Sequence, residues 1–260
     1  MRALSLPGCG CRGAFQFAVM AELWRRGERF DVVAGASSGS ICGAVTVAGL
    51  AEEGPTMWRA MARTPVVSTR WLRSEKSPFG MNAIVRDALR RFLPEERLQG
   101  TDAELLVSTT RARRFLARAE GALVVHSNRT RRDMHEVLVA SCTIPILYAR
   151  LPVLDGEVHV DGGAADNTLL EVLVARGATD ITVVTPYEGG AVSATLFVAE
   201  RPPVLPPHVR VRLISPARRL RLGRFDFAPD RLEEALSSPW VEQVIDVRRQ
   251  DAARDTTLAG

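Results

Sequence analysis

The sequence has 260 residues, of which 46% are hydrophobic and 25% are charged. These proportions are typical of a globular protein that forms a core without a disulfide or metal staple. The formal charge is +4, and the basic residues are not interleaved with aromatic ones, which argues against a nucleic-acid partner. We expect one domain over residues 1–260, with its motifs in 4–187 and a C-terminal extension in 188–260.

The cysteines show no paired metal-ligand spacing, and no His-x₃₋₅-His pattern follows them: Cys9, Cys11, Cys42 and Cys142. We therefore expect neither a metal nor a cofactor. Unpaired cysteines and the lack of a recognisable secretory signal favour a cytoplasmic location. No apolar stretch reaches the ~18 residues that a membrane-spanning helix needs.

Apolar strand-like segments alternate with helical ones along the chain. Strands are predicted at 2–8, 30–37, 104–112, 121–128, 156–163, 180–186 and 210–216. Helices are predicted at 13–27, 38–54, 133–145, 168–178 and 230–255, with further helical sequence between prolines in 52–100 and a proline-stiffened loop at 200–209. Such alternation predicts an α/β fold, a three-layer α/β/α sandwich with a largely parallel central sheet.

The segment LSLPGCGCRGAF, residues 4–15, places Gly8, Gly10 and Gly13 in a G-x-G-x-x-G pattern between a strand and a helix. A dinucleotide-binding fold would need an acidic residue at the end of the next strand, to bind the ribose. Asp31 precedes that strand, and GASSGS stands at its end. The spacing therefore disfavours a dinucleotide site.

The segment GASSG fits G-x-S-x-G, with Ser37 between Gly35 and Gly39 at a strand-to-helix junction. A sharp turn that exposes a serine hydroxyl crowds the residues two before and two after it, which favours glycine at both places. The N-terminus of the following helix adds a positive field close to the hydroxyl. This setting makes Ser37 a candidate nucleophile.

A nucleophilic serine needs a base, and none of the four histidines has flanking residues like those of a triad histidine. Asp161 ends a predicted buried strand and is followed by Gly162 and Gly163. It is either a base, if it lies within hydrogen-bond reach of the serine, or an aspartate that caps a turn. His159, two residues earlier, is either a modulating residue or a structural one.

These motifs, in this order, resemble those of the patatin-like phospholipases, serine acyl hydrolases that use a Ser-Asp dyad. The matching segments are GCGCRG at 8–13, GASSG at 35–39, ASCTIP at 140–145 and DGGAADN at 161–167. The later segment FDFAPDRLEEAL is also similar to bacterial members, so the resemblance spans nearly the whole chain.

The resemblance implies that Ser37 is the nucleophile and Asp161 its base. The implied activity is cleavage of a carboxylic ester of a lipid, of phospholipase A, lysophospholipase or esterase type. Acyl transfer to another acceptor with the same residues, or an inactive lipid-binding or regulatory module, stays open. A basic stretch over residues 210–224 is either a peripheral membrane contact or a solvated surface. The sequence makes no prediction of oligomeric state.

The resemblance also implies an oxyanion hole in the first glycine loop. The amides of Cys9 and Gly10, with Cys11 nearby, would bind the oxyanion. Arg12 matches the family's loop arginine, which stabilises charge or holds the loop, or else only caps the helix that follows. Cys9 stands where the family has a glycine, and this departure would strain the loop if the position needs a positive φ.

Overall fold

The computed structural model describes residues 1–112, 122–145, 150–187 and 205–245. Its strands are β1 (Arg2–Leu6), β2 (Val32–Gly35), β3 (Glu104–Arg111), β4 (Ala122–Ser127), β5 (Val153–Leu154), β6 (Glu157–Asp161), β7 (Asp180–Val184), β8 (Arg210–Pro216) and β9 (Trp240–Ile245). Its helices are α1 (Gly13–Arg25), α2 (Ser38–Val47), α3 (Gly54–Ala62), α4 (Trp71–Ser74), α5 (Met81–Phe92), α6 (Met134–Ser141), α7 (Leu170–Ala175) and α8 (Pro229–Leu236).

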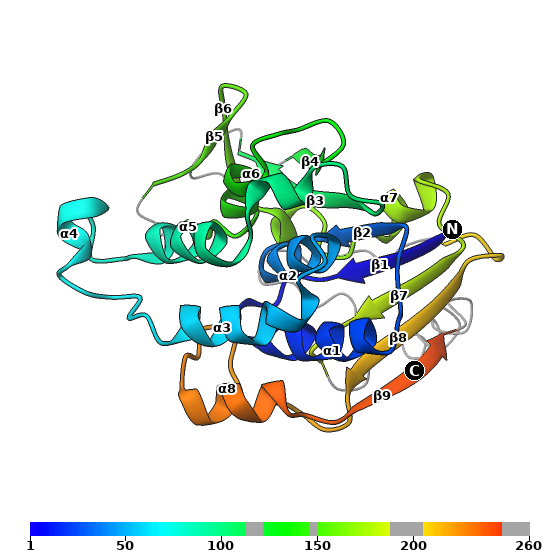
Figure 1. Ribbon diagram of the computed structural model, residues 1–260. Helices are drawn as coiled ribbons and strands as arrows, with labels where there is room; N and C mark the ends of the chain where they lie inside the picture. The colour runs from blue at the N-terminus through cyan, green and yellow to red at the C-terminus, as the bar shows by residue number, and fades with distance from the viewer. Residues whose placement is uncertain (113–121, 146–149, 188–204, 246–260) are drawn as a thin grey trace, which may run out of the picture.

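The strands form one sheet in the order β5-β6-β3-β2-β1-β7-β8-β9, with β4 also paired to β3 (Figure 1). The five inner strands from β3 to β8 pair in parallel, whereas β4, β6 and β9 pair antiparallel to their neighbours. Apolar side chains fill both faces of the inner strands, as a buried parallel sheet requires. The predicted α/β class around a largely parallel central sheet is confirmed.

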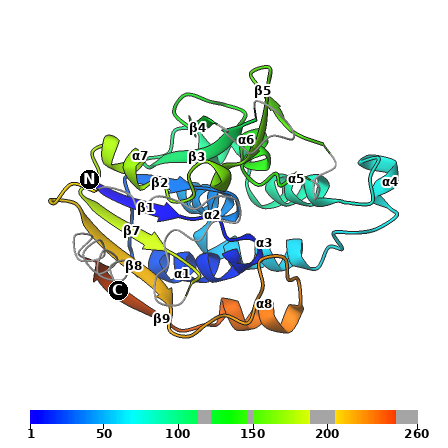
Figure 2. The same cartoon turned by 180° about the vertical axis from the view of Figure 1, so that it is seen from behind.

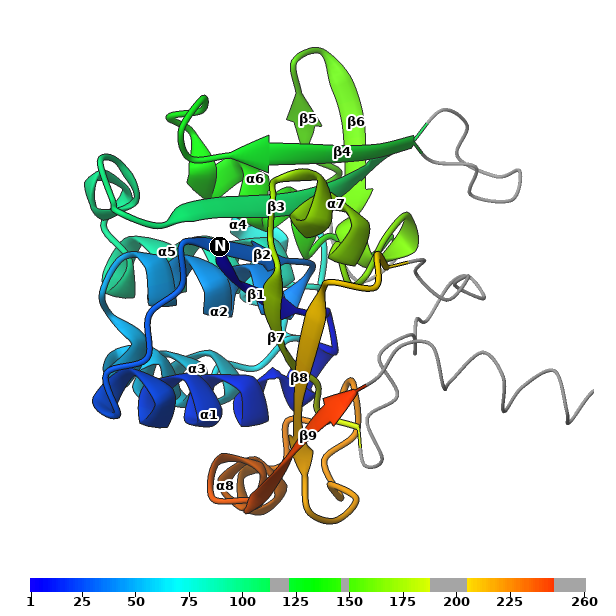
Figure 3. The same ribbon diagram turned by 90° about the vertical axis from the view of Figure 1, so that its right-hand side faces the viewer.

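Two hydrophobic clusters cover the sheet, one on each face. One joins the sheet to α1, α2, α3, α5, α6 and α8 through residues such as Phe15, Ile41 and Met57. The other joins it to α7 through Leu170 and Leu173. Figure 3 shows α1, α2 and α3 stacked on one side of the sheet. No helix among the described residues is long and apolar enough to cross a membrane.

Sheet register explains how two distant motifs meet. β1 and β2 are neighbours, with Leu6 opposite Gly35, so the loops that follow them lie side by side. β3 continues past the end of β2, and β6 returns along it with Asp161 opposite Thr109. Thr109 lies two residues beyond the partner of Gly35. Asp161 is therefore brought back to the level of Ser37, two residues after β2.

The predicted closing helix at 230–255 is confirmed only as far as Leu236, and the prediction is wrong for residues 240–245. α8 ends at Leu236, and Ser237, Ser238 and Pro239 lead into β9, which runs antiparallel to β8. Proline cannot continue the helical hydrogen bonds, and the sequence WVEQVI that follows is rich in residues that favour strands. The end of the predicted helix, 246–255, and residues 200–204 of the predicted loop lie outside the described residues.

Candidate active site

Ser37 lies in a tight turn between β2 and α2. Its backbone has φ 51° and ψ −130°, a conformation that a non-glycine residue adopts only when its surroundings impose it. A Cβ at Gly39 would lie 2.0 Å from the carbonyl oxygen of Leu6, and one at Gly35 would lie 2.7 Å from the Gly39 carbonyl oxygen. Both glycines are thus needed for the close packing of this turn.

The turn aims the Ser37 hydroxyl at Asp161. Ser37 Oγ donates a hydrogen bond of 2.6 Å to Asp161 Oδ2, and the Gly163 N–H donates one of 2.8 Å to Asp161 Oδ1. The Asp161 N–H donates to the Thr143 carbonyl at 2.8 Å, and Thr110 Oγ1 donates to the Asp161 carbonyl at 2.7 Å. Both carboxylate oxygens and both backbone polar groups are therefore fixed, which leaves the carboxylate one orientation.

Burial changes the acidity of this carboxyl group. Asp161 is 5% exposed, and desolvation raises its pKa from 3.8 to about 6, against the opposing effect of the hydrogen bonds from Ser37 and Gly163. Burial disfavours the charged form because the protein interior solvates it less well than water. An aspartate with this pKa is ionised at pH 7 and accepts a proton more readily than an ordinary aspartate.

Ser141, at the end of α6, holds the backbone of the turn. Its Oγ accepts a 2.9 Å hydrogen bond from the Ser37 N–H, and the Ser141 side chain is fully buried. The sequence motifs alone predicted no role for Ser141. The signal was present, because Ser141 is the serine of the ASCTIP segment that contributed to the family resemblance.

Replacement of Ser141 by Ala is expected to lower the free energy of unfolding by about 1–3 kcal/mol, because it leaves the buried Ser37 N–H without an acceptor. Thr46→Val is the matched control. It also removes a buried hydroxyl, but one that donates only to the Cys42 carbonyl one turn back in α2. Urea denaturation measures both; equal stability of the two variants would contradict this role for Ser141.

Asn167 clamps the first glycine loop to the loop after Asp161. Its Oδ1 accepts from the Gly8 N–H at 2.9 Å, and its Nδ2 donates to the Gly8 carbonyl at 3.1 Å. A Cβ at Gly8 would lie 2.7 Å from Ser37 Cβ, and one at Gly163 would lie 2.6 Å from Asn167 Oδ1. Glycine at these positions lets the two loops and the serine turn meet.

Of the remaining motif glycines, a Cβ at Gly162 would lie 2.2 Å from the Ser108 carbonyl oxygen, and one at Gly13 would lie 3.2 Å from Ser38 Cβ.

The three amides expected to bind an oxyanion differ in their present partners. The Cys9 N–H donates to Ser38 Oγ at 3.1 Å, and the Cys11 N–H donates to the Arg224 carbonyl at 2.8 Å. The Gly10 N–H has no acceptor among the described residues. Cys9 has φ −151°, whereas Gly10 has φ +60°. Cys9, which stands where the family has a glycine, therefore causes no positive-φ strain in the loop. The residue of this loop with a positive φ is Gly10.

Arg12 braces the glycine loop against the C-terminal part of the chain. Its Nε donates to the Leu222 carbonyl at 2.7 Å, and its guanidinium lies 5.2 Å from the centre of the Tyr187 ring. Its side chain makes no capping hydrogen bond at the start of α1. This geometry is that of a residue that holds the loop.

Two buried histidines near Asp161, His126 and His159, are linked by hydrogen bonds through Thr109. Thr109 Oγ1 lies 2.8 Å from His126 Nε2 and 2.9 Å from His159 Nδ1. Burial lowers the pKa of His126 to about 4 and lowers the pKa of His159 as well. Neither ring has a hydrogen bond to Ser37 or Asp161. In the part of the chain that the structure describes, no group of three His, Cys, Asp or Glu side chains is arranged to hold a metal.

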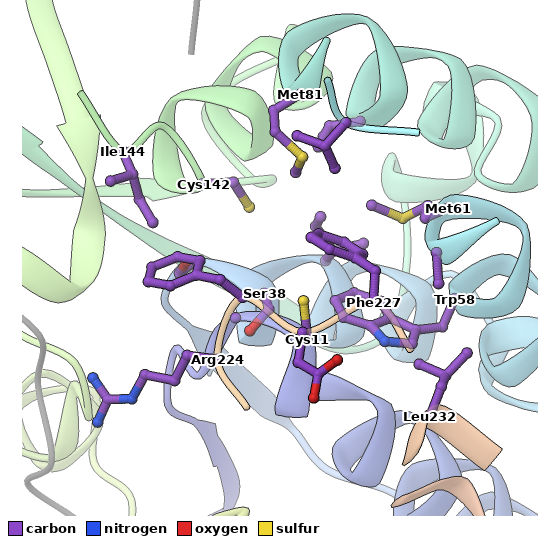
Figure 4. A pocket seen from close by; sticks show the side chains of 18 of the residues that line it. Cys11, Ser38, Trp58, Met61, Met81, Cys142, Ile144, Arg224, Phe227 and Leu232 are labelled. Atoms are coloured by element: carbon purple, nitrogen blue, oxygen red, sulfur yellow. The ribbon is translucent and has the colours of Figure 1, made fainter. Parts of the chain in front are cut away.

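An apolar cavity opens beside the serine. Its volume is about 310 Å³, and it lies between the serine turn, α3, α5 and the segment before α8 (Figure 4). Its lining is almost wholly apolar and includes Trp58, Met61, Met81, Ile144 and Phe227. A second hollow of about 30 Å³ is bordered by Ser37, Asp161 and residues of both glycine loops. The serine thus borders both the apolar cavity and this small hollow.

Comparison with known proteins identifies a family, and the solved structures that resemble this chain include that of VipD. The model of the family "Patatin-like phospholipase" matches residues 4–174. No curated protein sequence matches the chain. The crystal structure of VipD from Legionella pneumophila is 15% identical over 72% of this chain, with a TM-score of 0.40, and the match spans 50% of the VipD chain. Since the family model covers well over half of the sequence, the chain belongs to the patatin-like phospholipase family.

Proposed function

We propose that this protein is a serine acyl hydrolase that cleaves carboxylic esters of lipids. The observation that carries the proposal is the 2.6 Å hydrogen bond from Ser37 Oγ to Asp161 Oδ2, in a chain that belongs to a family of lipid hydrolases. A buried carboxylate with a raised pKa beside a strained serine is the arrangement that nucleophilic catalysis requires.

The reaction proceeds in two steps. Ser37 Oγ attacks the acyl carbonyl carbon while Asp161 takes the hydroxyl proton, and this proton then passes to the departing alcohol. A water molecule, whose proton Asp161 accepts, attacks the acyl-enzyme, and the fatty acid leaves as Ser37 recovers its proton. The small hollow beside Ser37 and Asp161, about 30 Å³, has room for that one water.

The Gly10 N–H is the first donor of the proposed oxyanion hole, because it has no acceptor among the described residues and borders both hollows beside Ser37. The Cys11 N–H becomes a second donor only when the oxyanion displaces the Arg224 carbonyl. The Cys9 N–H, bonded to Ser38 Oγ, supports the loop instead. One donor of this kind contributes about 3–4 kcal/mol to transition-state stabilisation.

The apolar cavity is the proposed acyl-chain site. A cavity of about 310 Å³ exceeds the space that one water needs many times over, so it has room for an acyl chain of medium length. The glycine loop and Ser37 line its inner end. An acyl group that fills the cavity therefore places its carbonyl beside the Ser37 hydroxyl.

The test is labelling with a fluorophosphonate probe, together with hydrolysis of p-nitrophenyl esters of two to sixteen carbons. The wild-type protein is expected to label on Ser37 and to show its highest kcat/KM near eight to ten carbons; Ser37→Ala is expected to do neither. A folded wild type that neither labels nor hydrolyses any ester contradicts the proposal and favours the inactive module. Added alcohol that diverts the acyl group from water indicates acyl transfer.

The basic stretch at 210–224 provides less free positive charge than its sequence suggests. Arg212 forms ion pairs with Glu28 and Glu242, Arg221 pairs with Glu234, and Arg210 pairs with Asp180. These ion pairs reduce the positive charge that the stretch could present to an anionic membrane. The four buried, unpaired cysteines support the proposal of a cytoplasmic location.

A further inference from the structure

Residues 63–80 form an arm that projects from the body of the protein between α3 and α5, with α4 near its tip (Figures 1 and 2). The arm is held by its own backbone. Val67 and Phe79 pair as an antiparallel bridge, and the Ser68 N–H donates to the Pro78 carbonyl at 2.9 Å. In addition, Trp71, the first residue of α4, donates a hydrogen bond of 2.9 Å from its Nε1 to the Pro65 carbonyl. The arm is thus a defined structure with a fixed relation to the cavity.

The inner side of the arm is a wall of the apolar cavity, to which it contributes Val66, Val67 and Phe79. Apolar side chains of the arm also face solvent, since Val67, although it lines the cavity, is 62% exposed and Leu72 is 52% exposed. On the opposite rim of the cavity Phe225 is 52% exposed. Exposed apolar side chains that surround the mouth of a binding cavity indicate an interaction surface.

The arm also carries unpaired positive charge. It contains the basic residues Arg63, Arg70, Arg73 and Lys76 and the single acidic residue Glu75, a net charge of +3 (four minus one). None of these five charged side chains forms an ion pair with a described residue, in contrast to Arg210, Arg212 and Arg221. Arg70 lies only over the Trp71 ring, at 4.1 Å. The chemistry complementary to this surface is therefore anionic and partly apolar.

We infer that the arm docks the protein onto an anionic lipid surface, with Leu72 in the interfacial layer and the arm cations against the head groups. Each such cation near an anionic membrane adds to binding, and the effect is screened by salt. Docked in this way, the cavity mouth faces the lipid, and an acyl chain enters without crossing water. The choice of a lipid as the partner rests on the proposed function, whereas the exposed apolar and basic residues of the arm are observed independently of it.

The experiment measures cosedimentation with vesicles of phosphatidylcholine, with or without 30% phosphatidylglycerol, in the Ser37→Ala background so that no lipid is consumed. We expect binding to the anionic vesicles that weakens as salt rises. The combined variant Arg70→Glu, Arg73→Glu and Lys76→Glu is expected to bind about tenfold or more weakly. Leu72→Ser is expected to lower binding several-fold with little change in its salt dependence.

The matched control reverses to Glu three other arginines that form no ion pair with a described residue: Arg29, Arg129 and Arg132. Each instead donates a hydrogen bond to a neutral oxygen. They lie in segments that bond to the first residues of β3, at the end of the sheet opposite the site. This variant has the same net charge as the arm variant and is expected to keep its vesicle binding. Equal loss in both variants, equal binding to uncharged vesicles, or a dimer that the arm substitutions dissociate would overturn the inference.

Hydrolysis of a water-soluble short-chain ester separates the two proposals. When Ser37 is left intact, the arm variants are expected to keep wild-type kcat/KM toward that ester. The substituted residues do not line the cavity: Arg70, Leu72, Arg73 and Lys76. Vesicle binding without any ester hydrolysis would refute the proposed function and leave the docking surface intact. Hydrolysis with vesicle binding that is unaffected by the arm substitutions would refute the docking surface alone.

Discussion

Asp161→Asn is expected to lower kcat of ester hydrolysis by about 10²–10⁴-fold, the usual contribution of a general base, and at the same time to stabilise the protein. The stabilisation follows from the raised pKa. Asp161 is buried and its pKa is about 6 rather than 3.8, so the folded carboxyl group binds its proton more tightly than the unfolded one does. Above pH 6 the folded state must carry an ionised carboxylate that it solvates poorly.

The direction of this linkage fixes the pH window. Between pH 3.8 and about 6 the folded state binds more protons than the unfolded state, so stability falls as pH rises and the full penalty is present above pH 6. At pH 7 that penalty is about 3 kcal/mol. An amide removes it while still accepting from the Gly163 N–H and donating to Ser37 Oγ. We therefore expect a gain of about 1–3 kcal/mol at pH 7 that vanishes below pH 4.

Urea denaturation of the wild type and Asp161→Asn at pH 4 and pH 7 measures this difference. His126 also titrates in this range, but it is present in both proteins and its contribution cancels. Asp166→Asn is the control, since the Asp166 carboxylate accepts from the Thr168 and Leu169 N–H groups at 2.9 Å, and its loss is expected to destabilise. An Asp161→Asn variant that is less stable than the wild type at pH 7 contradicts the buried-charge account.

The strands of the central sheet were predictable because each is a short, continuously apolar segment. Such a segment is buried on both faces when it forms an inner strand of a parallel sheet. β1, β2, β7 and β8 fall within the predicted segments, and the glycine pattern after β1 is a local signal of a tight turn. The closing helix failed for the converse reason. The residues after Pro239 include several that favour a strand, but β9 is fixed by its pairing with β8, a long-range contact that periodicity does not reveal.

The candidate site shows the same division. Ser37 and Asp161 were expected from local motifs, and their contact depends on a register in which β6 returns along β3. The partners of the oxyanion-loop amides were not foreseeable. The Arg224 carbonyl that accepts the Cys11 N–H is more than two hundred residues away in sequence, and backbone carbonyls carry no residue-specific signal. Such contacts decide which amide is available, and only the folded chain shows them.

The second large effect is the pH dependence of catalysis. If Asp161 is the base, kcat/KM is expected to be half-maximal at a pH of about 6 and to fall tenfold for each further pH unit below it, because only the ionised carboxylate accepts the Ser37 proton. Two nearby histidines also titrate. Burial lowers the pKa of His126 to about 4, well below this inflection, and lowers the pKa of His159 as well; neither ring is hydrogen-bonded to Ser37 or Asp161.

Released fatty acid, measured from about pH 3 to pH 8 at constant ionic strength, gives the profile, and circular dichroism at each pH shows whether the protein remains folded. A midpoint near 3.8 would mean that the carboxylate is solvated during catalysis and that the cavity admits water. A midpoint near 6 that Thr109→Val leaves in place would assign the titration to Asp161, because that substitution removes the hydroxyl between the two histidines and leaves the dyad untouched. Such a result would connect the burial of one carboxylate to both the activity of the site and its cost in stability.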